Sequence, residues 1–115
     1  MNYGDVCWVD LPDRGGREQR GRRPAIVGQD TARFARLPTI LLIPLTSRQD
    51  ALRFPGTLHL DPTPVNGLAA ASVAMIFQLG AADVRRVGQR LGKIDSADLA
   101  AAQAIANNCR TCPRT

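Results

Sequence analysis

The sequence predicts one mainly β (α+β) domain, a small coiled antiparallel sheet or barrel of five to six short strands with a C-terminal helix. Three observations point to this fold class. The chain has 115 residues, which suits a single domain and leaves no room for a second core. Its first three quarters contain short apolar or alternating segments, and only the last quarter has an alanine-rich, helical composition.

The expected strands are separated by clusters of proline, glycine, asparagine and aspartate. The first two strands are expected over residues 6–9 and 24–28, with Pro24 at a strand position that tolerates proline. Residues 12–23 between them are polar and contain glycines, so we expect a loop. The β-branched and leucine run at 39–45 is typical of a central strand buried on both faces. Further strands are expected over 57–60, 72–79 and 89–94.

The end of the chain predicts the helix, over residues 99–108. Ser96 is the expected N-cap, and Asp98 lies in the first turn, where the helix dipole favours a carboxylate. Residues 81–87 could form a short helical turn. The apolar stripe of the helix consists of Leu99, Ala102, Ile105 and Ala106.

The composition indicates a basic protein of the cytoplasm. The 15 Lys+Arg residues exceed the 10 Asp+Glu residues and give a formal net charge of +5. The longest apolar run, 40–43, is far too short to cross a bilayer, and the N-terminus lacks the pattern of a secretory signal. We assign residues 1–108 to a single domain and 109–115 to a C-terminal tail.

The three cysteines do not suggest a disulfide framework or a metal site. Cys7 lies in an apolar run and is expected in the core. Cys109 and Cys112 form a C-x-x-C pair in the tail. Zinc needs four ligands, and the other candidates, Cys7 and the single His59, are distant in sequence. We therefore expect no metal and no cofactor.

Familiar hydrolase signatures are missing from the sequence. It has no phosphate-binding glycine motif, and a catalytic triad would have to use His59, which we expect to be solvated. A nucleic-acid chaperone is a weaker alternative, because it predicts exposed stacking aromatics. Aromatic residues make up only 4% of the chain, and Trp8 and Phe77 lie in strands expected to be buried.

The segment 14–23 concentrates positive charge around a single acid, Glu18. Planar guanidinium groups match phosphate oxygens, so a polyanion is the natural partner of such a loop. A solvated charged loop, or a general bias of the sequence toward arginine, would also account for the composition. The arginines of this segment are Arg14, Arg17, Arg20, Arg22 and Arg23.

A second polar group follows the central strand. Thr46, Ser47 and Arg48 place two hydroxyls and a cation where the strand emerges from the core. A simple turn at the end of the strand is the alternative interpretation.

Taken in order, these segments resemble the MazF/PemK (Kid) family of toxin endoribonucleases. The resemblance covers about residues 3 to 107, and the C-x-x-C tail has no counterpart in it. The matching blocks are Tyr3-Gly4-Asp5-Val6 with Trp8-Val9-Asp10-Leu11, Glu18-Gln19 with Arg23-Pro24, Pro44-Leu45-Thr46-Ser47, Ser72-Val73-Ala74 with Gln78, and Gln89-Arg90-Leu91-Gly92-Lys93-Ile94.

The resemblance implies an SH3-like barrel that forms a homodimer, cuts single-stranded RNA without a metal, and is inhibited by an acidic antitoxin. It assigns catalysis to Arg23 and Thr46, with Glu18 in a loop over the same site. Gyrase-inhibiting toxins of similar fold, which bind without catalysis, are the alternative. The remaining positions that we expect to contact RNA are Arg17, Gln19, Arg20, Arg22, Ser47, Arg48 and Gln78.

The chemistry of the residues is compatible with this activity. In metal-free cleavage the neighbouring 2′-OH attacks the phosphorus and leaves a cyclic phosphate and a 5′-OH. Arg23 suits stabilisation of the charged phosphorane, and Thr46 can donate a hydrogen bond to a phosphate oxygen. Glu18 is the candidate base, or equally an ion-pair organiser of the loop.

Overall fold

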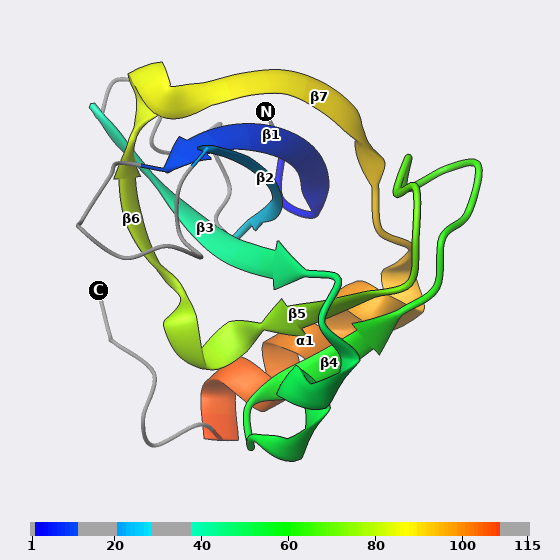
Figure 1. Ribbon diagram of the computed structural model, residues 1–115. Helices are drawn as coiled ribbons and strands as arrows, with labels where there is room; N and C mark the ends of the chain where they lie inside the picture. The colour runs from blue at the N-terminus through cyan, green and yellow to red at the C-terminus, as the bar shows by residue number, and fades with distance from the viewer. Residues whose placement is uncertain (1, 12–20, 29–37, 109–115) are drawn as a thin grey trace.

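The computed structural model describes residues 2–11, 21–28 and 38–108, which form seven strands, three 3-10 turns and one helix (Figure 1). The strands are β1 (Asp5–Leu11), β2 (Gly21–Val27), β3 (Thr39–Thr46), β4 (Thr57–Leu60), β5 (Ser72–Met75), β6 (Gly80–Asp83) and β7 (Val87–Lys93). The 3-10 turns are η1 (Gln49–Arg53), η2 (Ile76–Gln78) and η3 (Val84–Arg86), and the helix is α1 (Ser96–Asn108). No helix in these ranges is long and apolar enough to span a membrane.

All strand pairs are antiparallel, in the order β4-β5-β3-β2-β1-β7, with β6 also on β3. The central strand is β3, as the sequence predicts. One edge of β3 pairs with β2, and the other pairs with β6 near its start and with β5 near its end. The turn η2 separates β5 from β6 along this second edge, which is why the strand expected over 72–79 ends at Met75.

Alternation along β1, β2 and β3 divides the apolar side chains between two cores. The first, which we call the ring core, lies inside the curve of β6, β3, β2, β1 and β7 (Figure 1). The second, the helix-side core, lies between the strands and α1. The ring core consists of Cys7, Val9, Ala25, Val27, Ile40 and Leu42, with Ala82 and Val87 packed against it.

The strands curve as in a small barrel, but hydrogen bonding does not close the sheet. In the described residues β6 and β7 are joined through η3 and are not paired with each other. The side chain of Asp83 fixes this corner by accepting a hydrogen bond from the backbone N–H of Arg85 at 2.9 Å. The expected small, coiled antiparallel sheet with a C-terminal helix is thus confirmed, but the sheet is open and has seven strands where five to six were expected. The additional strand is β6, which replaces part of the helical turn expected over 81–87.

Two further boundaries differ from the sequence-based expectation. Strand β2 begins at Gly21 and not at Pro24, because Gly21, Arg22 and Arg23 pair with the end of β1. Helix α1 is capped by Asp95 and not by Ser96, which is already helical. The carboxylate of Asp95 accepts a hydrogen bond from the backbone N–H of Asp98 at 2.7 Å, and its carbonyl accepts one from Leu99. The predicted stripe of α1 packs on the helix-side core.

The loop between β4 and β5 is docked closely on β7. The buried Asn66 accepts hydrogen bonds from the backbone N–H groups of Thr63 and Leu68. A side chain at Gly92 would overlap the carbonyl oxygen of Val65, so the two backbones need glycine at this contact. This docking connects the β4–β5 hairpin to the far edge of the sheet.

Candidate active site

Thr46 occupies the last position of β3 and is buried, with 9% of its surface exposed. Its Oγ1 accepts a hydrogen bond from the backbone N–H of Arg48 at 3.3 Å, so the chain folds back over the hydroxyl as it leaves the strand. A hydroxyl that accepts one bond can still donate its own hydrogen. Thr46 is therefore a fixed donor at the edge of the core.

Arg23 reaches the same place through the register of β2 on β3. Ala25 lies opposite Pro44, and the same antiparallel register carried two residues further places Arg23 opposite Thr46. Both side chains point to the side of the ring core, since Arg23 alternates in phase with Ala25 and Thr46 with Leu42. Arg23 is half-buried, and its Nε is fully covered.

Arg22 points to the opposite side of the sheet from Arg23, as expected for adjacent residues in a strand. Its guanidinium carbon lies 5.0 Å from the ring centroid of Trp8. Trp8 is only half-buried, so the expectation that it lies in the core is wrong. Cys7 and Val9 take the two positions of β1 that face the ring core, and Trp8 lies on the other side with Val6 but is not part of the helix-side core.

Phe77 is likewise not fully buried. It lies in η2 beside the exposed Phe54, with the two ring centroids 6.4 Å apart. The argument from buried aromatics against a stacking surface therefore does not hold in this structure.

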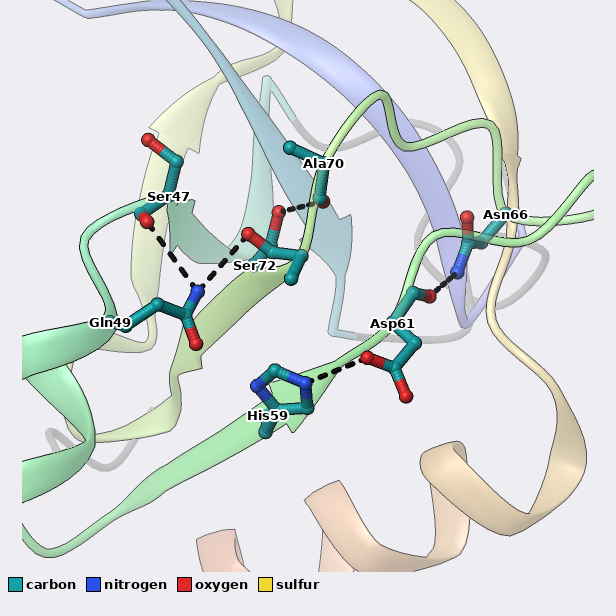
Figure 2. A network of polar contacts seen from close by, with 8 residues as sticks. Ser47, Gln49, His59, Asp61, Asn66, Ala70 and Ser72 are labelled. Atoms are coloured by element: carbon teal, nitrogen blue, oxygen red, sulfur yellow. Dashed lines mark hydrogen bonds and ion pairs between the residues drawn. The ribbon is translucent and has the colours of Figure 1, made fainter.

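The polar residues after Thr46 are exposed. Arg48 forms an ion pair with Asp50 at 3.3 Å, and both side chains are largely solvated, so the pair contributes little stability. Gln49, which the sequence analysis did not single out, donates from Nε2 to the carbonyls of Ser47 and Ala71 at 3.4 and 3.2 Å (Figure 2). Gln49 thereby ties the exit of β3 to the start of β5.

Gln78 is exposed in η2, on the edge of β3 opposite to β2, and is thus separated from Arg23 by the width of β3. Residues 12–20 lie outside the described ranges. Nothing in the structure therefore places the remaining expected site residues, which are Arg14, Arg17, Glu18, Gln19 and Arg20.

His59 and Cys7 behave as the sequence predicts. His59 is exposed, and its Nε2 lies 2.8 Å from Oδ1 of Asp61 (Figure 2). Cys7 is fully buried, and burial, reinforced by the charge of Asp5, raises the pKa of its thiol to about 11. Within the described ranges no three His, Cys, Asp or Glu side chains gather into a possible metal site.

Comparison with known proteins agrees with the fold and with the sequence blocks. The chain is 28% identical to the endoribonuclease MazF of Staphylococcus saprophyticus over 91 residues, which are 79% of this chain and 75% of the relative. The crystal structure of MazF from Deinococcus radiodurans matches with a TM-score of 0.76 and 23% identity, and 93% of each chain is covered.

A mycobacterial endoribonuclease in complex with its cognate antitoxin matches with a TM-score of 0.74 and 16% identity, covering 100% of this chain and 99% of that one. At these identities the structural matches show a shared fold. The family model for PemK-like, MazF-like toxins matches residues 2–108, which is nearly the whole chain. The protein therefore belongs to the family of PemK-like, MazF-like toxins of type II toxin–antitoxin systems.

Proposed function

We propose that this protein is a toxin endoribonuclease that cuts single-stranded RNA, with mRNA as its natural target in the cytoplasm. The observation that carries the proposal is the β2–β3 register at Ala25 and Pro44, which supports an alignment of Arg23 with Thr46 when it is continued by two residues. A cation and a hydroxyl donor held together at a strand end suit a phosphate group. The curated relative with 28% identity is an endoribonuclease, which supports the same activity here.

In the proposed reaction, the 2′-OH beside the cut loses its proton and attacks the phosphorus, and the 5′-oxygen leaves and takes up a proton from water. The product ends are a 2′,3′-cyclic phosphate and a 5′-OH. Arg23 stabilises the charge that grows on the phosphorane, which is commonly the largest contribution of such a site. Since its Nε is buried and the residue is anchored in a strand, this charge is positioned before the substrate arrives.

Thr46 has the second role, as a donor to a phosphate oxygen. The hydrogen bond from Arg48 orients its Oγ1, which leaves the hydroxyl hydrogen to point at the substrate. Glu18 is the proposed base that removes the 2′-OH proton, because a permanently charged guanidinium is a poor base. The nucleophile belongs to the RNA, so the proposed reaction needs no metal and no cofactor.

The proposed partners are a second copy of the chain and an acidic antitoxin. A mycobacterial relative has been solved with its cognate antitoxin. The +5 charge and the arginines of segment 14–23 would attract an acidic, extended segment as they attract RNA. A 115-residue chain has little core to spare, and a symmetric partner would cover exposed apolar surface. Light scattering at micromolar concentration should therefore report a dimer, and a fully active monomer would refute this part.

The activity is tested by incubating the purified protein with a long RNA in excess EDTA. We expect discrete cuts with 5′-OH ends from the wild type and from Lys93→Gln, which removes an exposed charge. Arg23→Ala and Thr46→Ala should be folded and inactive. Full activity in either folded alanine variant would remove the catalytic assignment.

Glu18 is tested separately, by the dependence of the rate on pH. Glu18→Gln should slow cleavage and abolish the acidic limb of the pH–rate profile. If the profile is unchanged, Glu18 organises the loop instead. The gyrase-binding alternative has no support in the comparisons, in which the relatives with a named activity are endoribonucleases.

A further inference from the structure

We propose that Trp8 and Arg22 form a platform on which one base of the RNA stacks, beside the catalytic pair. This inference rests on the proposed function and adds a binding residue, Trp8, to it. The guanidinium of Arg22 lies over the indole of Trp8 at 5.0 Å, within the range of a cation–π contact. Arg22 is exposed, so the guanidinium presents a flat, charged surface to solvent.

The strand register places this platform next to the proposed chemistry. Trp8 lies opposite Pro24, and its neighbour Val9 lies opposite Arg23. Arg22 and Arg23 are consecutive, so their Cα atoms are about 3.8 Å apart while their side chains leave β2 on opposite sides. Arg22 and Trp8 are therefore neighbours along the strands of the proposed phosphate contact at Arg23, on the other side of the sheet.

The partner strand β7 is irregular beside Trp8. The register between β1 and β7 shifts between Cys7 and Val9, on either side of Trp8. Gly88 of β7 lies against Trp8 there, and a Cβ at Gly88 would be 3.6 Å from the Trp8 Cβ. Irregularities of this kind re-aim side chains and are frequent next to functional sites.

A base suits this surface better than an isolated phosphate does. Unstacked bases of single-stranded RNA stack on aromatic rings and on guanidinium planes, whatever their sequence. A guanidinium that already rests on an indole loses little freedom when a base covers its other side. A phosphate would need only the charge, which arginines elsewhere could supply without Trp8.

Fluorescence offers a direct test, because Trp8 is the only tryptophan of the chain. The probe is a short 2′-O-methyl oligonucleotide that spans one of the cuts made in long RNA, so that it binds without being cleaved. Saturating probe should quench or shift the emission of Trp8, whereas poly-glutamate, a stand-in for an acidic protein segment, should have much less effect. If the emission of Trp8 does not change when the probe binds, or changes equally with poly-glutamate, the proposal is overturned.

Substitutions separate stacking from charge. Arg22→Lys keeps the positive charge but lacks the planar guanidinium group. We therefore expect at least about 5-fold weaker probe binding with an unchanged salt dependence. Arg22→Gln should weaken binding and also flatten its dependence on salt. Trp8→Leu should weaken binding, and Trp8→Phe should retain most of it. The control is Lys93→Gln. Lys93 lies opposite Asp5 at the other end of β1, so this variant should bind the probe as the wild type does.

The outcomes distinguish the two proposals. If Arg22→Lys binds as tightly as the wild type, Arg22 is a simple charge contact and the platform is wrong. If the wild type cuts RNA while Trp8 does not respond to bound probe, the platform fails and the proposed function stands. If the wild type does not cut RNA, the proposed function fails and the platform fails with it.

Discussion

Thr46 and Arg23 show how two ordinary strand positions acquire a chemical role. Each residue continues the alternation of its strand, but both lie where the ring core ends and polar atoms can reach solvent. The hydroxyl of Thr46 is oriented by a backbone N–H, and Arg23 is held by the pairing of β2 with β1. Preorganised groups of this kind need little rearrangement when charge develops on a substrate.

The hydroxyl of Thr46 can be tested without changing the packing. Thr46→Val keeps the branched shape, so the free energy of unfolding should change by only about 1 kcal/mol while RNA cleavage is lost. Thr46→Ser keeps the hydroxyl and should retain measurable cleavage. Denaturant titration and single-turnover cleavage check the two parts, and a Thr46→Val protein that cuts RNA as fast as Thr46→Ser would contradict the assigned role.

Cys7 leads to a prediction about alkaline pH. Burial raises the pKa of its thiol from 9.0 to about 11, so between these values the unfolded chain loses the proton while the folded protein keeps it. Below pH 9 both states keep the proton, so the thiol does not change the free energy of unfolding. As pH rises toward 11, the free energy of unfolding falls by up to about 1.4 kcal/mol per pH unit.

The measurement compares the wild type with Cys7→Ala, both with Cys109 and Cys112 changed to serine. From pH 9 to 11 the protein with Cys7 should lose stability relative to the protein with Cys7→Ala, measured as the free energy of unfolding of each. A difference that stays constant from pH 8 to 11 would show that Cys7 ionises in the folded protein as easily as in the unfolded one.

Among the elements, β7 depends most on its glycines. Gly92 faces the backbone of Val65, with no space for a side chain, whereas Gly88 has room for a Cβ at ordinary contact distances. We expect Gly92→Ala to lower the free energy of unfolding by about 2 kcal/mol or more, because backbone atoms would have to move. Gly88→Ala in the same strand is the matched control and should change it much less. Equal effects of the two substitutions would contradict the close docking of the β4–β5 loop.

The start of α1 offers a second matched pair. Asp95→Ala removes the side chain that caps the helix and should cost about 1 kcal/mol of stability. Ser96→Ala alters a residue that is already helical and should have almost no effect. Thermal denaturation of both variants checks this, and the reverse order would restore Ser96 as the cap.

The elements also show how far the sequence could predict the structure. Alternation and β-branched runs identify β1, β3 and β4, since these patterns report burial directly. The start of β2 was missed because Gly21, Arg22 and Arg23 are polar, and their strand conformation comes from pairing with β1. The interruption by η2 was missed because Ile76 remains apolar and buried within the turn.

The same limits apply to the site. The sequence blocks singled out Arg23 and Thr46, but their alignment can be inferred only from the β2–β3 register, continued two residues beyond Ala25 and Pro44. Gln49 carries no distinctive pattern, because its role depends on the carbonyl of Ala71, which is distant in sequence. Trp8 was expected in the core since a tryptophan in an apolar run is normally buried, but it lies on the side of β1 away from the ring core and outside the helix-side core that buries Val6.

At the scale of the whole molecule, the open sheet, the terminal helix and the family match describe a small, basic toxin. The proposed site lies where β2 begins and β3 ends, at the edge of the ring core. A site at such an edge suits a long, flexible polymer that can bind across it. The central claim is that this edge cleaves RNA through the 2′-OH of the substrate itself.

One measurement tests this claim most directly. An end-labelled RNA that contains one cut site is incubated with the wild-type protein in excess EDTA, beside the same RNA with a single 2′-deoxy nucleotide on the 5′ side of the cut. The account predicts a cut in the first RNA, with a cyclic phosphate and a 5′-OH at the new ends, and no cut in the second. Cleavage of the 2′-deoxy RNA at the same position, or activity that disappears in EDTA, would contradict it.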